Sequence, residues 1–550
     1  MHAEAITKSR RRRSCAWLLW LCCVFPWVTP FAGGPSVSVQ PWLITASCAA
    51  LLFAMRGWTA PRWPLVLWAA LAALLTAGRS LPALDTIALF AALALIIAMA
   101  GLAGGDSRDD FVCVTAAAWL TAALVSCVLA LLQYFGLADA LAPWVSHASL
   151  GEAYGNLRQR NQLASLMAIG LAALLWFVRC GWSWRRAAVP LLLLAAGSAA
   201  SASRTGALQW VMLLVFAVLW RGSARRQVVV LAGVGLAAYA IAAVAFPWLL
   251  SYAWGVSGAS VFARFGHNEG CGGRGVLWSN VLHLIGQRPW TGWGWGELDY
   301  AHYITLYPGA RFCDILDNAH SLPLHLAVEL GVPVAVMACG ALAWALLRLQ
   351  PWREIDSTRQ LALSVLFAVL LHSLLEYPLW YGPFQVAFGL CLGMLWPGRT
   401  PEMPPSRQRG LACTLGAGLT LAMVAYAAWD YDRISQIYLA PESRAPQYRD
   451  DPLPLIRQSR LFRMHALFAE FTLTPLTPAN AAWTYDTALA LLHYSPEPRV
   501  IEKVIESAVL LKHDDVALAH LARFRAAFPQ EHAQWAREHG IPPPPAQVKD

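Results

Sequence analysis

The chain has 550 residues, of which 58% are hydrophobic and only 13% are charged. Soluble domains carry about 25% charged residues, so this composition excludes a soluble multidomain protein and also a disordered or collagen-like chain. It equally excludes a nucleic-acid-binding protein. The formal net charge of +9 therefore requires a different explanation, which depends on where the basic residues lie.

Long apolar runs divide the first 430 residues, and such runs can cross a hydrocarbon core of about 30 Å as helices. The sequence therefore predicts an all-α, polytopic membrane protein with about 12–13 transmembrane helices. The expected spans are 15–32, 39–55, 63–78, 83–104, 111–135, 161–178, 187–203, 206–220, 227–249, 321–347, 360–376, 381–396 and 410–429.

The basic residues predict the orientation of these spans, because Lys and Arg accumulate in cytoplasmic loops. Lys8 and the run Arg10 to Arg13 place the N-terminus in the cytoplasm. Counted alternately from there, the predicted inner loops hold twenty Lys and Arg residues and the short outer loops hold four. The positive charge is therefore mostly a topology signal, and we expect a multi-pass protein of the bacterial inner membrane.

Two hydrophilic regions follow an odd number of spans and are therefore predicted to be periplasmic. One is a large loop, 250–320, within a membrane domain that covers residues 1–430. The other is the C-terminal region, 431–550, which carries 27 of the 73 charged side chains. Apolar residues at helical spacing in 498–511 and 514–528 predict helices there, and a tetratricopeptide-like arrangement is one interpretation.

Two of the twelve cysteines, Cys271 and Cys313, lie in the large loop. A periplasmic location is oxidising, so these two residues either form a disulfide or remain free thiols. The spacing of the cysteines does not resemble a metal site, and the sequence predicts neither a metal nor a cofactor.

Polar clusters are predicted at the outer ends of the helices, where buried charged and amide groups are costly and are candidates for function. The first cluster precedes the span 161–178 and combines cations with amides. The second is the turn Ser203-Arg204-Thr205-Gly206. The candidate residues in these two clusters are Arg158, Gln159, Gln162 and Arg204.

Three further motifs lie in the large loop and beyond it. Glycines and tryptophans surround Arg274 and Arg288, and they would suit close approach of a ligand, flat contacts with sugar rings, or an interfacial aromatic belt. His320 follows Asn318 beside this cationic loop and is a candidate general base. The last motif, 376–383, contributes Glu376, Tyr377 and Tyr381.

Together these residues offer several cations and one base, which suits displacement at a carbon that bears a phosphate leaving group. Arginines would stabilise the departing charge, and the histidine would take the proton of an attacking hydroxyl. The expected substrate is a lipid phosphate that enters from the membrane.

The same motifs, in this order, resemble those of the PglL-type bacterial protein O-oligosaccharyltransferases of the O-antigen ligase and polymerase superfamily. The resemblance rests on many motifs together and covers most of the chain. Its main elements are 158–164, Ser203 to Gly206, 288–294, Asn318-Ala319-His320 with Glu329-Leu330-Gly331, and 376–381.

The resemblance implies en bloc transfer of a glycan from undecaprenyl pyrophosphate to a Ser or Thr hydroxyl of pilin or another exported protein. His320 matches the essential periplasmic histidine of the family, and Arg204 and Arg274 match its pyrophosphate-binding arginines. Gln159 or Gln162 matches its glutamine at a helix entrance, and Tyr377 or Tyr381 matches its late tyrosine.

Three other functions are compatible with parts of the pattern. An O-antigen ligase that acts on lipid A core and a Wzy-like polymerase share the superfamily, but the hydrophilic C-terminal region favours a protein acceptor by analogy. A secondary transporter would place its polar groups near the membrane midplane, often in repeated halves. The polar motifs here are expected at the outer ends of the helices, so a transporter is less favoured.

Overall fold

The computed structural model describes residues 16–58, 84–103, 108–256, 258, 261, 270–396 and 407–540. The expected span 63–78 and the basic N-terminal run lie outside these residues. All regular secondary structure in the described part of the chain is helical, as predicted. The chain divides into two compact units.

The first unit, called here the membrane unit, comprises Met1–Ala83, Ile87–His267 and Trp344–Ala428. Its described helices begin with Ala16–Val28 and continue with α2 (Val39–Arg56), α4 (Leu84–Leu102), α5 (Arg108–Tyr134), α6 (Arg160–Arg179), α7 (Trp184–Ala200), α8 (Arg204–Leu219), α9 (Arg225–Trp254), the end of α14 (Val332–Leu349), α15 (Ser357–Ser373), α16 (Gly382–Leu395) and most of α17 (Arg407–Ser435).

Seven described helices are long and apolar enough to cross a membrane, which confirms a polytopic membrane protein. They are α2, α4, α5, α6, α9, α14 and α17. Three shorter apolar helices, 16–28, α8 and α16, also fall on predicted spans. The total of about thirteen spans remains a prediction.

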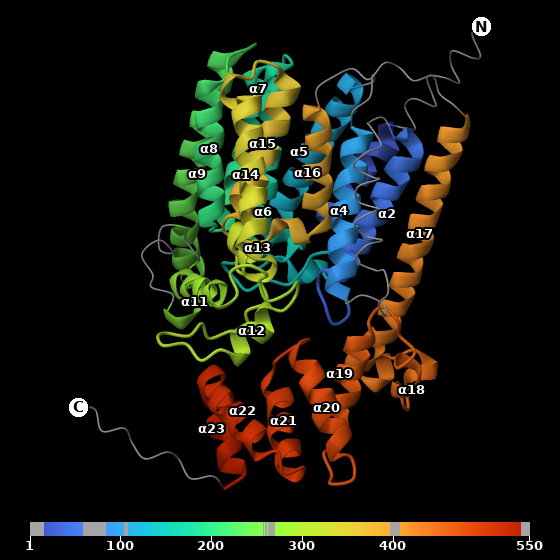
Figure 1. Cartoon of the computed structure of the whole chain (residues 1–550). Helices are drawn as coiled ribbons and strands as arrows, with labels where there is room; N and C mark the ends of the chain where they lie inside the picture. The colour runs from blue at the N-terminus through green and yellow to red at the C-terminus, as the bar shows by residue number, and fades with distance from the viewer. Residues whose placement is uncertain are drawn as a thin grey trace. The chain divides into compact units, whose positions relative to one another are not determined.

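Helix α6 forms the centre of the membrane unit. Nearly all of its residues are buried, because each side of the helix packs on another helix. Figure 1 shows it among α5, α7, α8 and α15, and it packs against all four. Small residues allow the close approach: a Cβ atom on Gly206 of α8 would collide with Ala164 of α6.

The second unit, called here the loop-and-tail unit, comprises Leu84–Thr86, Asn268–Ala343 and Trp429–Asp550. The loop contributes α11 (Arg274–Gln287), α12 (Leu298–Ile304), α13 (Leu322–Leu330) and the start of α14. The tail contributes α18 (Leu453–Ile456), α19 (Arg463–Leu473), α20 (Ala481–Leu492), α21 (Pro498–Leu510), α22 (Asp514–Ala527) and α23 (Pro529–Glu538).

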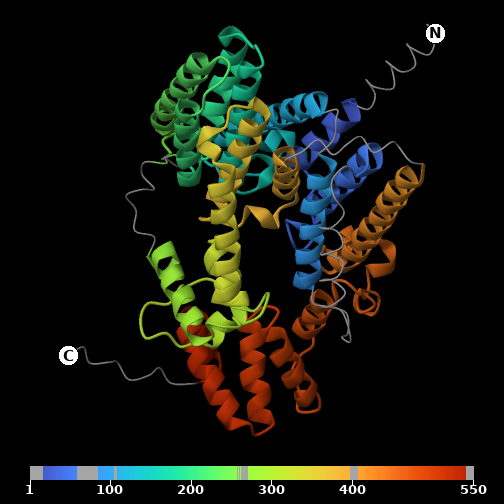
Figure 2. The ribbon, with the colours of Figure 1, turned by 45° about the horizontal axis from the view of Figure 1, so that its top comes forward.

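The tail is built from successive packed helices, which lie side by side in Figure 1 and Figure 2. The predicted helices 498–511 and 514–528 are present as α21 and α22. The loop and the tail share one core, in which Tyr303 of α12 and His520 of α22 are hydrogen-bonded, with 2.7 Å between Oη and Nδ1. Burial lowers the pKa of His520 to about 4, so this imidazole is neutral near neutral pH.

The expected span 321–347 is wrong as a single helix, because it breaks at Gly331 into α13 and α14. Gly331 has φ of 89° and ψ of 158°, a conformation open essentially to glycine alone. A Cβ atom there would collide with the Trp290 carbonyl. The nine residues of α13 are too short to cross a membrane.

The glycine and tryptophan motif 288–296 packs its backbone against this break. Trp293 N–H donates to Val328 O at 2.9 Å, and Val332 N–H donates to Pro289 O at 2.8 Å. A Cβ atom on Gly292 would collide with the Glu329 backbone. The glycines of this motif were expected to allow a ligand to approach the backbone. At Gly292 and Gly331, the backbones of two protein segments approach each other instead.

We predict that Gly331→Ala destabilises the loop-and-tail unit by about 2 kcal/mol or more, because alanine adds backbone strain and a collision with Trp290. The measurement is the apparent melting temperature of the purified protein. Gly340→Ala is the matched control, since Gly340 lies inside α14 with nothing within 4 Å of an added Cβ. Equal melting temperatures for the two variants would contradict the assignment of Gly331 as a structural break.

Candidate active site

His320 lies in the loop that leads into α13, with a backbone conformation unusual for a residue other than glycine. Its φ is 49°, in the left-handed region, which costs about 1 kcal/mol or more unless neighbouring contacts enforce it. Its own N–H donates to Asn318 Oδ1 at 2.9 Å, and Trp278 Nε1 donates to Ala319 O at 3.1 Å. The imidazole is therefore attached to a backbone held from both sides, while its side chain remains partly exposed.

Arg274 is the first residue of α11, the helix whose Trp278 contacts the His320 loop. Trp278 follows Arg274 by four residues and so occupies the same face of α11 one turn later. Trp278 in turn contacts Ala319, the neighbour of His320. A disulfide joins Cys271, just before α11, to Cys313, with a Cα to Cα distance of 5.5 Å. A cation and a candidate base are therefore tied to one local framework.

Arg288 lies at the opposite end of α11 from Arg274. Their Cα atoms are fourteen positions apart, which corresponds to about 20 Å along the helix axis. The Arg288 guanidinium lies over the Trp293 ring, 4.2 Å from its centroid. This contact with Trp293 indicates a packing role for Arg288.

Glu329 is buried in the same unit, close to several ionisable groups. Its side chain is 1% exposed, its Oε2 accepts a hydrogen bond from Gly296 N–H at 3.1 Å, and its Oε1 has no partner among the described residues. Burial, with smaller contributions from the nearby carboxylates of Asp85 and Asp299, raises the pKa of Glu329 to about 8. Its carboxyl group therefore carries a proton near neutral pH.

His325 lies one turn before Glu329, with 3.4 Å between Nε2 and Glu329 Oε2. Burial, with a smaller contribution from His320, lowers the pKa of His325 to about 4. Both partners are thus shifted toward their neutral forms, because a buried ion pair would leave two charges poorly solvated. The sequence points to Glu329 only as part of a motif and does not reveal its burial.

In the membrane unit, the second group of candidate residues lies where α6 and α8 begin and α15 ends. Asn161 joins the three segments: its Nδ2 donates to Glu376 Oε1 at 3.1 Å, and its Oδ1 accepts from Ser203 Oγ at 2.6 Å. Ser203 also caps α8, whose first residue is Arg204. The structure thus brings Arg204 and Glu376, distant in sequence, to one end of the helix bundle.

The two glutamines at the entrance of α6 have different environments. Gln159 is the N-cap, and its Oε1 accepts a hydrogen bond from Gln162 N–H at 2.7 Å. Gln162 is 3% exposed, and its Nε2 has no hydrogen-bond partner in the described part of the chain. A buried unpaired amide costs about 1–3 kcal/mol, so Gln162 is the better candidate for a ligand contact.

The remaining candidates of this unit lie around the same ends. Arg158 donates hydrogen bonds to the carbonyl oxygens of Pro30 and Asn156, so its guanidinium anchors the loop before α6. Tyr377 and Tyr381 stack with ring centroids 6.0 Å apart, on either side of the short helix η5 (Pro378–Trp380). Both tyrosines are partly buried, so burial does not distinguish between them.

Sequence reasoning missed a second polar chain deeper in the membrane unit. Ser165 Oγ lies 2.9 Å from His372 Nδ1, and Gln209 Nε2 donates to Ser165 Oγ at 2.7 Å. These residues lie on α6, α8 and α15, and all three are buried. The signal was available: Asn161 and Ser165 are four residues apart on α6, and His372 and Glu376 are four residues apart at the end of α15.

We predict that the Glu329→Gln variant loses less folding stability than the wild type as the pH rises. Because the folded-state pKa lies near 8 and the ordinary value near 4.5, the native protein holds a proton that the unfolded chain releases between these values. The contribution of Glu329 to the free energy of unfolding is therefore greatest below about pH 4.5. It decreases, by a few kcal/mol at most, as the pH rises to about 8. Glutamine keeps an acceptor for Gly296 and removes this dependence.

The measurement is the apparent melting temperature of wild type and variant between pH 5 and 9. Glu442→Gln, at an exposed position of the same unit, is the control. Parallel curves for wild type and Glu329→Gln would show that Glu329 does not titrate in this range.

Three family models match successive parts of the chain. The model described as "Protein glycosylation ligase" matches residues 153–177, which include Arg158, Gln159 and Gln162. The model described as "O-Antigen ligase" matches residues 189–339, which include Arg204, Arg274 and His320. The model described as "Virulence factor membrane-bound polymerase, C-terminal" matches residues 360–540.

A curated relative is the "General O-oligosaccharyltransferase" of Acinetobacter baylyi (strain ATCC 33305 / BD413 / ADP1), which is 26% identical over 301 residues. The alignment covers 51% of this chain and 50% of the relative, so the chain spans about half the length of the curated relative that it matches. Together with the three models, this match confirms the resemblance to PglL-type oligosaccharyltransferases within the O-antigen ligase superfamily.

Proposed function

We propose that the protein is a membrane oligosaccharyltransferase that transfers a preassembled glycan from undecaprenyl pyrophosphate to Ser or Thr hydroxyls of pilin or another exported protein. The reaction would take place at the periplasmic face of the inner membrane. The observation that carries the proposal is the local framework around His320, in which Trp278 of α11 contacts the His320 loop and a disulfide joins Cys271, just before α11, to Cys313. The family resemblance supplies the classes of donor and acceptor.

The assigned roles follow from the chemistry of glycosyl transfer. The acceptor oxygen attacks the anomeric carbon of the first sugar, and the bond from this carbon to the phosphate oxygen breaks. His320 takes the proton of the hydroxyl, and Arg274 stabilises the negative charge of the departing undecaprenyl pyrophosphate. The family resemblance assigns pyrophosphate binding to Arg204 of the membrane unit as well. No redox change or external reactant is required.

Residues beside these groups receive positioning roles. Gln162 offers a buried amide donor to the lipid-linked glycan, and Gln159 caps α6 beneath it. Glu376 and Asn318 orient their neighbours through the hydrogen bonds described above. Arg158, Tyr377 and Tyr381 remain candidates for donor or acceptor contacts, whereas the position of Arg288 favours a structural role.

An O-antigen ligase is the second candidate, because the O-antigen ligase model matches residues 189–339. It would use the same class of donor and transfer the glycan to lipid A core. Expression in a host that makes one defined undecaprenyl-linked glycan, with and without a co-expressed pilin, separates the two. A glycan-sized increase in the intact mass of the pilin supports a protein acceptor, and modification of lipid A core alone supports the ligase.

We predict that His320→Ala abolishes glycan transfer, since the acceptor hydroxyl loses its base. The measurement is the intact mass of the acceptor protein, with the amounts of enzyme and donor lipid determined in parallel. His147→Ala, at an exposed histidine outside the candidate site, should retain transfer. Transfer by His320→Ala at the wild-type rate would exclude the proposed role of this histidine.

We also predict that Trp278→Phe lowers the rate constant kcat about fivefold and leaves the KM for the donor nearly unchanged. Phenylalanine also has an aromatic ring but lacks the indole N–H that donates to Ala319 O. This hydrogen bond is worth about 1 kcal/mol. The purified enzyme, assayed with a lipid-linked glycan and an acceptor, gives both constants. Trp290→Phe, at a residue that is 78% exposed, is the control, and an equal loss in both variants would contradict a positioning role for Trp278.

A further inference from the structure

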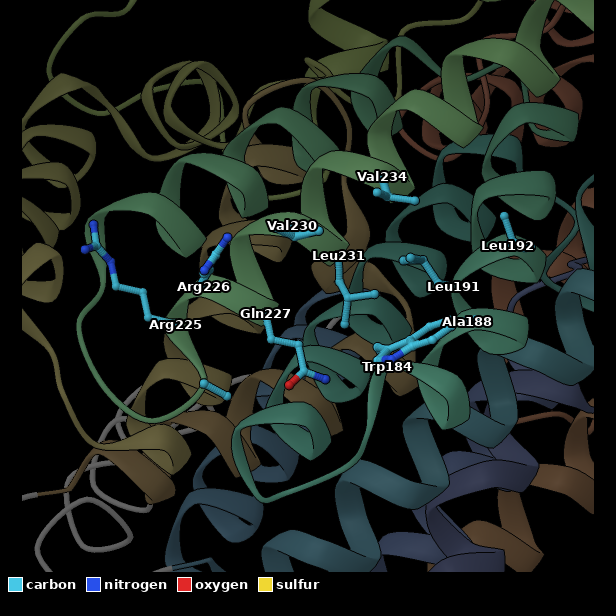
Figure 3. Close-up of a pocket in the computed structure, with 11 residues that line it drawn as sticks. Trp184, Ala188, Leu191, Leu192, Arg225, Arg226, Gln227, Val230, Leu231 and Val234 are labelled. Atoms are coloured by element: carbon cyan, nitrogen blue, oxygen red, sulfur yellow. The ribbon is translucent and has the colours of Figure 1, made fainter.

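A groove of about 820 Å³ lies between the first turns of α7 and α9 in the membrane unit. Helix α7 contributes Trp184, Leu191 and Leu192 to its wall, and α9 contributes Val230, Leu231 and Val234. Figure 3 shows these side chains between the two helices, with Arg225 and Arg226 at the start of α9. Gln227 Nε2 of α9 donates to Trp182 O at 3.2 Å, in the loop just before α7.

The charged residues lie at one end of the groove and the apolar residues along its length. Arg225 and Arg226 line the groove, and none of its lining residues is acidic. Arg185 and Arg186 are exposed on the first turn of α7, beside Trp184. None of the ion pairs in the described part of the chain involves these four arginines.

The arginines can contact an anionic group without giving up their present contacts. Arg225 Nη2 donates to Val218 O at 2.6 Å, which leaves other guanidinium donors for a ligand. Ala224 is the N-cap residue of α9 and also lines the groove, and it makes no side-chain cap hydrogen bond. A helix N-terminus without a side-chain cap attracts negative charge, and guanidinium groups bind phosphate oxygens.

The dimensions of the groove match one leaflet of a bilayer. Helix α9 is a candidate membrane span, so its arginine-bearing end lies at the membrane surface. Eight residues separate Arg226 from Val234, which corresponds to about 12 Å along the helix axis. One leaflet contributes about 15 Å of hydrocarbon. A lipid with an anionic headgroup and an acyl chain therefore fits this groove, which is charged at one end and apolar along its length.

We propose that this groove binds an anionic phospholipid, with the headgroup phosphate at Arg225 and Arg226 and an acyl chain along α9. The distribution of basic residues predicts that this is the cytoplasmic leaflet. A free phosphate would use the arginines but not the apolar wall, and a zwitterionic lipid would use the wall but gain less from the arginines. The charge and the apolar wall together specify an anionic lipid of the bilayer, independently of the proposed transfer reaction.

The test uses the full chain in detergent, supplied with equal amounts of phosphatidylglycerol and phosphatidylcholine, and native mass spectrometry to count bound lipids. We expect phosphatidylglycerol adducts to exceed phosphatidylcholine adducts at least fivefold. The double variant Arg225→Gln with Arg226→Gln should lose this preference. The charge-matched control, Arg348→Gln with Arg353→Gln, changes two exposed arginines that do not line the groove and should retain it.

A second pair of variants tests the apolar wall while every charge is retained. Val234→Trp fills the groove, whereas Val244→Trp changes an exposed residue of the same helix outside it. We expect Val234→Trp to reduce phosphatidylglycerol adducts at least fivefold and Val244→Trp to leave them unchanged. Equal binding of the two lipids by wild type, or equal effects of each variant and its control, would overturn the proposal.

Discussion

The burial of α6 on every side is the constraint on which the membrane unit depends. Helices α5, α7, α8 and α15 pack around α6 and enclose it. The enclosure forces the polar residues of α6 to find partners on neighbouring helices, because an unpaired polar group inside a membrane protein is costly. Asn161 and Ser165 meet this requirement through Glu376, Ser203, His372 and Gln209.

The loop-and-tail unit solves a different problem, which is how to hold a reactive side chain on an irregular loop. His320 lies in a conformation that an isolated chain would seldom adopt. Trp278, Asn318 and the Cys271–Cys313 disulfide act on the segment around it. The glycines of two motifs allow backbone to pack on backbone, so that α13 ends at a defined place.

The glycine motif also illustrates where an interpretation from residue type alone goes astray. Glycines beside arginines and tryptophans resemble a ligand-binding loop, and the sequence does not distinguish approach by a ligand from approach by the chain itself. At Gly292 and Gly331 the approaching group is protein backbone. Arg288 likewise resembles a second phosphate-binding residue, but the length of α11 separates it from Arg274. The distance in space between two residues follows from their separation in sequence only when the secondary structure between them is known.

The sequence by itself determined the helical class, most of the described membrane helices, the helical tail and the family resemblance, because these follow from apolar run length and local periodicity. It also selected the polar clusters, since charged groups beside apolar helices are conspicuous. Only the tertiary structure decided which of these residues meet: the pairing of Cys271 with Cys313, the link from Asn161 to Glu376, the burial of Glu329, and the break at Gly331. Each depends on contacts between segments far apart in the chain, and local pattern carries no information about such distances.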